Sequence, residues 1–305
     1  MPAWSSGSSL DRVQHTGLLY AVYDRKAIMD NAHVRSPRYA VNCSILFTEL
    51  PLLERPAAAK NAGFDAIELW WPFASAVPGD AEVERFERAI QDSGVALVGL
   101  NFAAGDMPGG DRGLVSWPER AQEFRDNIAV TLGMGERLGC PAFNALYGNR
   151  VDGVDPAAQD DLAAENLAMA AAAAAAFGAT ILVEPVSGAD RYPLLTAVDV
   201  VEVITRVERE SGATNLGLLA DLYHLAVNGD DVDKVIETQS GRIAHVQIAD
   251  APGRNEPGTG TLPLESQLED LQAGGYDGWV ALEYKPSTTT DRSFDWLHRD
   301  SRSVD

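Results

Sequence analysis

The chain has 305 residues, enough for one large domain or two ordinary ones, and 46% of them are hydrophobic, so a sizeable core can be buried. With 24 Lys and Arg against 45 Asp and Glu, the net charge is −21, which repels nucleic acid and anionic membrane surfaces, and no basic patch offsets it. The two cysteines, Cys43 and Cys140, lie far apart in no metal-binding pattern, which excludes a disulfide framework and a cysteine-rich zinc site. We expect free thiols in a cytoplasmic protein that binds neither nucleic acid nor a membrane.

The first 37 residues show neither helical nor strand periodicity. Their opening, Ser5–Ser9, is rich in serine and glycine, which is typical of a mobile tail. The longest apolar run near the start, Leu18–Tyr23, is too short for a secretory signal or a membrane span. We therefore predict a poorly ordered extension over residues 1–37 and a single domain over residues 38–305.

From Tyr39 onward, short apolar runs alternate with longer amphipathic stretches, as strands and helices do in α/β proteins. Eight such units in about 250 residues match the size of a (β/α)8 TIM barrel, whereas a doubly wound sheet more often offers fewer strands and a Gly-rich nucleotide turn. The predicted strands are Tyr39–Ser44, Ala66–Leu69, Ala96–Asn101, Ala142–Leu146, Thr180–Glu184, Leu216–Asp221, Ile243–Gln247 and Trp279–Glu283. The predicted helices are Leu52–Ala62, Ala81–Ser93, Pro118–Leu138, Pro156–Phe177, Ala197–Glu210, Val232–Ser240 and Leu264–Ala273.

The last four predicted strands end in acids or an amide, and in such a barrel the strand ends carry the active site. Three carboxylates and an amide oxygen at one mouth would repel each other unless a cation neutralised them. Hard oxygen ligands suit Mg²⁺ or Mn²⁺, with Co²⁺ or Zn²⁺ as further choices. The sequence therefore predicts a divalent metal site with the ligands Glu184, Asp221, Gln247 and Glu283.

Several segments of the chain resemble the hydroxypyruvate isomerase family, a branch of the xylose isomerase-like TIM barrels. They are NCSILFTELPLLERPAAAKNAGFDAIELWWP, NFAAGDMPGGDRG, ILVEPVS, DLYH, HVQIADAPGRNEPGTG and EYKP, in that order along the chain. The resemblance covers roughly Arg38 to Pro286. It implies a sugar acid that isomerises between ketone and aldehyde forms, with Glu184 and Glu283 as acid and base and the same four metal ligands.

The chemistry of such an isomerase explains these residue types. Converting hydroxypyruvate to 2-hydroxy-3-oxopropanoate (tartronate semialdehyde) removes a proton from C3, forms an enediolate and returns a proton to C2. Two carboxyl groups flanking the substrate can exchange these protons, one as base and the other as acid. A divalent metal would stabilise the charge that develops on the substrate oxygens.

Other polar residues near the strand ends are candidates for substrate binding. His224 follows strand six, where an imidazole could donate to a substrate oxygen, and Glu68 ends strand two, where it could bind a substrate hydroxyl or orient a neighbour. A sugar acid also needs a cation for its carboxylate, for which we favour Arg254, with Lys285 closing an ion pair. His245 is predicted to face the barrel interior as a core or supporting group.

Other reactions on this scaffold stay open. Isomerisation of 2-oxo-tetronate or 3-epimerisation of a neutral ketose depends on pocket depth, which the sequence does not show. A repair endonuclease of similar architecture needs a histidine-rich zinc cluster, and this chain has five histidines. A sugar-acid sensor that no longer catalyses a reaction should have lost the strand-end carboxylates, and this sequence keeps them. We expect a small sugar acid as the partner, and a homo-oligomer is possible.

Overall fold

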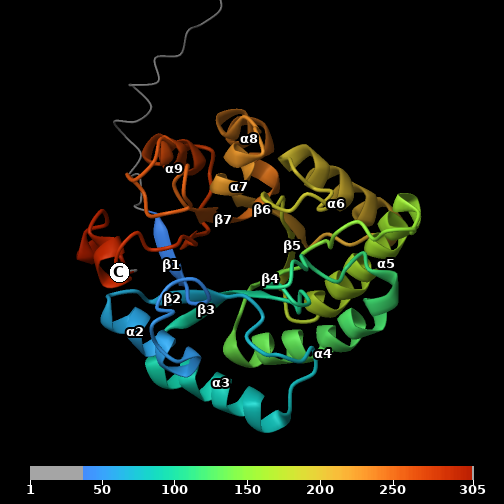
Figure 1. The fold of residues 1–305 in the computed structure, drawn as a ribbon, viewed down its shortest axis with the longest axis horizontal. Helices are drawn as coiled ribbons and strands as arrows, with labels where there is room; N and C mark the ends of the chain where they lie inside the picture. The colour runs from blue at the N-terminus through green and yellow to red at the C-terminus, as the bar shows by residue number, and fades with distance from the viewer. Residues whose placement is uncertain (1–36, 304–305) are drawn as a thin grey trace, which may run out of the picture. The chain divides into compact units, whose positions relative to one another are not determined.

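The computed structural model describes residues 37–303, so the predicted extension over residues 1–37 lies outside the described residues except for its last position. Eight parallel strands close into a barrel in chain order, and β8 pairs with β1 to complete the ring (Figure 1). This confirms the predicted TIM barrel. The strands are β1 Arg38–Asn42, β2 Ala66–Leu69, β3 Ala96–Asn101, β4 Ala142–Asn144, β5 Thr180–Val183, β6 Leu216–Asp221, β7 Ile243–Ile248 and β8 Trp279–Leu282.

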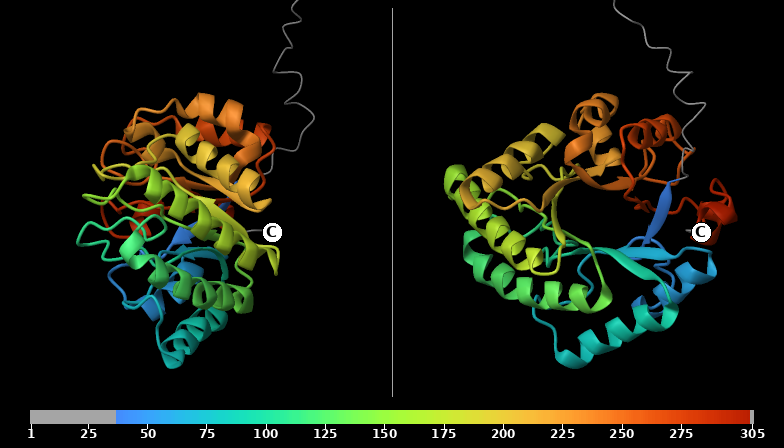
Figure 2. Two further views of the ribbon diagram at one scale, coloured as in Figure 1. Left: turned by 90° about the vertical axis from the view of Figure 1, so that its right-hand side faces the viewer. Right: turned by 180° about the vertical axis from the view of Figure 1, so that it is seen from behind.

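Helices surround the barrel on its outside, as the side and rear views show (Figure 2). The main apolar core fills the space between strands and helices. The α-helices are α2 Arg55–Asn61, α3 Asp80–Ser93, α4 Ala121–Leu138, α5 Pro156–Ala175, α6 Ala197–Ser211, α7 Leu222–Val227, α8 Val232–Gln239 and α9 Leu264–Ala273. Short 3-10 turns are Leu52–Glu54, Pro118–Arg120, Ser240–Arg242, Asp291–Phe294 and Arg299–Ser301.

Local sequence explains where the helices begin and which face they bury. The Thr196 hydroxyl accepts the backbone N–H of Asp199, whose carboxylate accepts the N–H of Thr196, and this capping box starts α6. Along the same helix Val200, Ile204 and Val207 recur at helical spacing and are buried. The helix therefore packs its apolar face against the barrel and leaves its charged face in solvent.

The interior of the barrel is divided into two layers. The lower layer is apolar except for His245, which is in register with Leu219. Its apolar members are Ala40, Ala66, Val98, Ala142, Leu182, Leu219 and Ala281. Side chains alternate along a strand, so the next side chain to face the interior comes about two residues after each lower-layer residue. These next positions form an upper layer nearer the carboxyl ends of the strands. Polar residues occupy that upper layer, so the site rests on a packed, mostly apolar floor.

Two strands end two residues earlier than predicted, each for a local reason, and one helix is missing from the prediction. β1 ends at Asn42 rather than Ser44, because the Asn42 side-chain oxygen accepts the Ser44 N–H and turns the chain. β4 ends at Asn144 rather than Leu146, and soon after it the Tyr147 N–H donates to a side-chain hydroxyl instead of a neighbouring strand. Helix α7 is missing from the prediction because its six residues, LYHLAV, lack an amphipathic pattern.

The structure also describes the two cysteines and the lengths of the helices. Cys43 and Cys140 are buried and unbonded to each other, as predicted. No helix formed by residues 37–303 is both long and apolar enough to cross a membrane.

Candidate active site

Each of the eight strands supplies one buried polar side chain within one residue of its carboxyl end. Asn101 is in register with Asn144, and Asp221 with Gln247, so these neighbours lie side by side around the barrel mouth. All members of the set are between 1% and 7% exposed. We call the set the polar ring: Asn42, Glu68, Asn101, Asn144, Glu184, Asp221, Gln247 and Glu283.

Sequence reasoning found five ring members and missed the three asparagines. Asn144 was hidden because β4 was predicted two residues too long, which placed it inside the strand. Asn42 was hidden in the same way, and Asn101 was recognised as a strand end without being considered for the site. An amide at a strand end is the signal that would have found them.

Glu184 and Glu283, the predicted acid and base, are each held by neighbouring donors. The Asn144 Nδ2 donates to Glu184 Oε2 at 2.6 Å. The Arg254 Nη2 donates to Glu283 Oε1 at 2.5 Å, and the Asn42 Nδ2 donates to Glu283 Oε2 at 3.1 Å. These bonds fix both carboxyl groups on rigid strand ends, which is what proton transfer at a defined carbon requires.

Burial and mutual repulsion raise the pKa values of both carboxyl groups. Burial, reinforced by the charge of Asp221, raises the pKa of Glu184 from 4.5 to about 8. Burial also raises the pKa of Glu283 well above its usual range, although Arg254 opposes this and Glu184 adds to it. The polar ring thus carries more negative charge than the neighbouring Arg254 neutralises. It therefore favours the uptake of a proton or a cation.

Asp221 caps helix α7 and leaves one oxygen for the site. Its Oδ1 accepts the backbone N–H groups of Tyr223 and His224, at 2.9 and 3.2 Å. Its Oδ2 lies 3.5 Å from Arg254 Nη2 and 3.5 Å from His224 Nε2. The same short sequence, DLYH, therefore positions a carboxylate and an imidazole together.

His224 is a neutral donor in this environment. Its Nδ1 accepts the backbone N–H of Ser187 at 3.0 Å, so its proton is assigned to Nε2, which faces Asp221 and Glu184. Burial, together with the charges of Arg254 and Arg112, lowers the pKa of His224 from 6.5 to about 4, although Asp221 opposes this. The imidazole can therefore donate to a substrate oxygen at neutral pH.

Gln247 is oriented by Glu68 and His245. Glu68 Oε1 accepts from Gln247 Nε2 at 2.7 Å and from Asn42 Nδ2 at 2.8 Å, while Glu68 Oε2 lies 2.6 Å from His245 Nε2. Both Glu68 oxygens are thus bonded to the chain's own side chains. The Gln247 Oε1 is buried and has no hydrogen-bond partner among the described residues, so it is left as an acceptor with nothing to accept.

These side chains fit a divalent cation. Glu184, Asp221 and His224 each offer a ligand atom within 4.8 Å of the others. Since His224 Nε2 is assigned a proton, the oxygen atoms of the carboxylates and the unpaired Gln247 Oε1 are the better donors, and such a set suits a hard ion.

Arg254 reaches the site from the loop between β7 and α9, in a left-handed backbone conformation with φ of 58°. Asp250 anchors this loop, because its buried carboxylate accepts four backbone N–H groups, from Ala251, Gly258, Gly260 and Leu262. The guanidinium also lies over the Tyr223 ring, 5.4 Å from its centroid. Arg254 therefore lies at the site as expected, but its guanidinium faces the carboxylates of Glu283 and Asp221.

Lys285 does not form the expected ion pair. Its side chain is exposed and pairs with no carboxylate among residues 37–303. Its backbone matters instead: the Lys285 N–H donates to the Arg254 carbonyl at 2.7 Å, and its carbonyl accepts Asn255 Nδ2. The loop after β8 thus supports the loop that carries the arginine.

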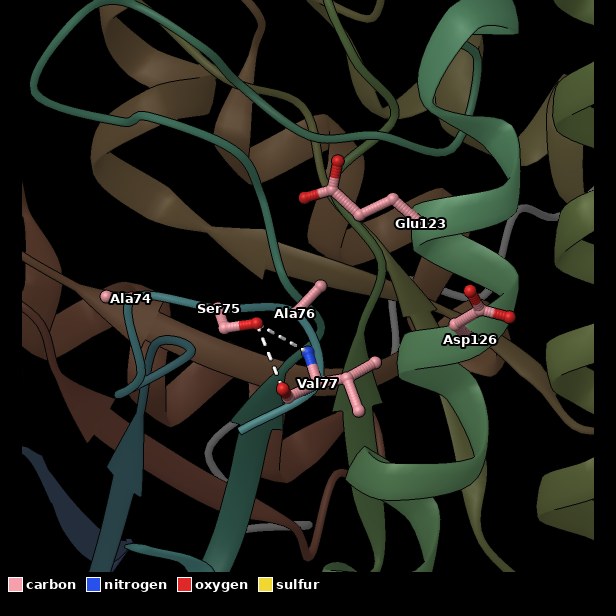
Figure 3. Close-up of a pocket in the computed structure, with 6 residues that line it drawn as sticks. All are labelled: Ala74, Ser75, Ala76, Val77, Glu123 and Asp126. Carbon is pink, nitrogen blue, oxygen red and sulfur yellow. Dashed lines mark hydrogen bonds between the residues drawn. The ribbon is translucent and has the colours of Figure 1, made fainter. Parts of the chain in front are cut away.

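A pocket of about 510 Å³ lies away from the polar ring, between the segment after β2 and the start of α4 (Figure 3). The Ser75 hydroxyl in this pocket is bonded to the backbone of Val77, and Glu123 is paired with Arg120. Since its polar groups are satisfied by the chain itself, the pocket offers no reactive group.

Comparison with known proteins agrees with this fold. The family model for the xylose isomerase-like TIM barrel matches residues 56–299. A putative hydroxypyruvate isomerase of Streptomyces coelicolor is 54% identical over 272 residues, covering 88% of this chain and 98% of that protein. A 2-oxo-tetronate isomerase of Cupriavidus necator is 34% identical over 262 residues, covering 86% and 97% of the two chains.

Among solved structures, a Brucella melitensis protein described as AP endonuclease, family 2, matches with a TM-score of 0.77 and 33% identity, covering 86% of this chain and 98% of that one. The chain therefore belongs to the xylose isomerase-like TIM barrel family. Its place within the hydroxypyruvate isomerase branch, expected from its motifs, is confirmed by the identity to the Streptomyces protein.

Proposed function

We propose that this protein is an aldose-ketose isomerase of sugar acids, an intramolecular oxidoreductase that converts hydroxypyruvate to 2-hydroxy-3-oxopropanoate. The relatives named above support the substrate class. The observation that carries the proposal is that Glu184 and Glu283 both belong to the polar ring, where both are buried and both have raised pKa values. A carboxyl group whose pKa lies near neutral pH can both take and return a proton.

In this mechanism one of the two glutamates removes the proton from C3 and the other returns a proton to C2. Asn144 and Arg254 hold these carboxyl groups in place, and the neutral His224 donates from Nε2 to a substrate oxygen as the enediolate charge develops. A divalent cation, held by Glu184, Asp221, Gln247 and Glu283, would supply Lewis-acid stabilisation of that charge. Mg²⁺ or Mn²⁺ suits these oxygen donors best.

A second candidate substrate is 2-oxo-tetronate, which the name of the Cupriavidus relative favours. It has one more hydroxylated carbon and needs the same proton transfers, so the same residues would serve. A zinc-cluster endonuclease is disfavoured, because the histidines at the barrel mouth within residues 37–303, His224 and His245, are committed to Ser187 and Glu68. We expect the enzyme to act in the cytoplasm, and a homo-oligomer stays a prediction.

The test offers the purified protein hydroxypyruvate, 2-oxo-tetronate and a neutral ketose in parallel, with and without EDTA, and identifies products by NMR. We expect the aldehyde isomer of a sugar acid, much slower reaction of the ketose, and loss of turnover with EDTA that Mg²⁺ or Mn²⁺ restores. Turnover of the ketose alone would replace the proposal with an epimerase. Binding of a sugar acid with no turnover would favour a sensor.

A further inference from the structure

The polar ring has two halves of different charge. The β5–β8 half holds the three carboxylates that would bind a cation, together with Gln247. The β3–β4 side instead carries two neutral amides, Asn101 and Asn144. An anionic carboxylate on the substrate is repelled by the acidic half, so electrostatics places it toward the amide side.

Arg254 is poorly suited to receive that carboxylate. Its Nη2 already donates to Glu283 at 2.5 Å and faces Asp221 at 3.5 Å, so an incoming anion would compete with two protein carboxylates. Breaking a buried pair of this kind leaves an uncompensated charge behind. A cation with no acidic partner is a better receptor.

Arg112, on the loop between β3 and α4, is such a cation. Its Nη1 donates to the carbonyls of Met107 and Asp111 at 2.9 and 2.7 Å, and its guanidinium pairs with no carboxylate of any residue in 37–303. It is half-buried, and its charge is close enough to His224 to lower the pKa of that imidazole. Its Nε and Nη2 donors have no partner within the described part of the chain.

The backbone fixes Arg112 beside the end of β4. The Gly148 N–H donates to the Arg112 carbonyl at 3.0 Å, and the Ser116 N–H donates to the Tyr147 carbonyl at 2.8 Å. Gly113, with φ of 112°, packs so closely that a Cβ atom there would lie 1.9 Å from the Leu146 carbonyl oxygen. The loop therefore lies directly on the segment that follows β4.

Asn101 adds an independent observation on the same side. It ends β3, its Cα pairs with that of Asn144, and it is 7% exposed. Its side-chain amide forms no hydrogen bond with another described residue and keeps some contact with solvent, so its donor and acceptor groups are open to a ligand. Arg112 and Asn101 belong to the same strand and its following loop.

We propose that Arg112, assisted by Asn101, binds the carboxylate of the sugar acid and makes the enzyme select acids over neutral sugars. This inference rests on the proposed function and takes from Arg254 the role that the sequence suggested. Arg254 then positions Glu283. A guanidinium with free donors can hold a carboxylate in a fixed orientation, which places C2 and C3 against the two glutamates.

The experiment compares Arg112→Gln and Arg112→Lys with the unchanged enzyme on hydroxypyruvate and on dihydroxyacetone, in which a neutral CH2OH replaces the carboxylate. Proton exchange in D2O is followed by NMR. We expect Arg112→Gln to raise KM for hydroxypyruvate about 10- to 100-fold while exchange from dihydroxyacetone changes less than about 3-fold. Arg112→Lys, which keeps the charge, should fall between the two.

Arg191→Gln is the matched control, because Arg191 is exposed and paired with Asp152, and it should leave both substrates unchanged. Calorimetric titration with glycerate, a non-isomerising acid, gives a second measurement, and its Kd should rise about 10-fold or more in Arg112→Gln. An unchanged ratio between the two substrates and an unchanged Kd would overturn the inference. So would a selective loss in Lys285→Gln instead. If the unchanged enzyme isomerises no sugar acid, the proposed function itself fails.

Discussion

Glu68 fixes which atom of the Gln247 amide faces the barrel mouth. A carboxylate can only accept hydrogen bonds, so the bond of 2.7 Å from Gln247 Nε2 to Glu68 Oε1 forces the amide oxygen to the opposite side. That oxygen is the buried acceptor with no partner among the described residues. His245 and Asn42 hold Glu68 in turn, so the orientation is fixed by a closed network.

We therefore predict that Glu68→Gln weakens metal binding without a large change in shape, since the new amide can donate or accept and no longer dictates the orientation of Gln247. The dissociation constant for Mn²⁺ should rise about 10- to 100-fold, measured by competition with a chelator. Adding Gln247→Glu to this variant should restore affinity, because both oxygens of a carboxylate are equivalent. Equal affinity of the single variant and the unchanged protein would contradict the role given to Glu68.

Glu184→Gln and Glu283→Gln test the proton transfers. Each removes a titratable carboxyl group and keeps its size, so kcat should fall about 100- to 10,000-fold. The thermal transition should persist, because the fold does not need the proton. A variant that retained most of its turnover would remove its glutamate from the acid-base pair.

The raised pKa of Glu184 predicts how the metal-free protein responds to pH. Between pH 4.5 and about 8 the native carboxyl group holds a proton that the unfolded chain has lost, so stability falls as pH rises through this window. His224, whose pKa is lowered from 6.5 to about 4, acts in the opposite direction but only below pH 6.5.

From pH 6.5 to 8, in EDTA, we expect the free energy of unfolding to fall by roughly 1 kcal/mol per pH unit. Either Glu184→Gln or saturating Mg²⁺ should flatten this slope, since each removes the uncompensated charge. Chemical denaturation at several pH values measures it. A slope that is equally steep with and without Mg²⁺ would argue against a cation beside Glu184.

Asp250→Asn tests the loop that carries Arg254. An amide can replace some of the acceptor capacity but not the full set of four backbone N–H bonds. We expect a loss of about 2–4 kcal/mol in stability and a lower kcat, because Arg254 no longer holds Glu283. Asp152→Asn, at a carboxylate that is 93% exposed, is the control and should change stability by less than about 0.5 kcal/mol. Equal losses of stability in the two variants would show that the Asp250 carboxylate does not specifically stabilise this loop.

The regular features of this fold were predictable from the sequence because they depend on periodicity. Alternating apolar runs gave the eight strands, and strand-end acids such as Glu184 and Asp221 lie on one ring because all parallel strands point the same way. The pairing of Arg254 with Glu283 was not predictable, since it joins two loops through tertiary contacts. Helix α7 was missed because six residues are too few to show a period.

The most direct test of the account follows hydrogen at the reacting carbons. Hydroxypyruvate is converted in D2O and the product is analysed by NMR. If Glu184 and Glu283 pass protons through an enediolate, deuterium from the solvent enters C2 of the product and C3 of the recovered substrate. A product that keeps the original hydrogen at C2 through every turnover would mean that hydrogen moves directly between the two carbons, and the two-glutamate mechanism would be wrong.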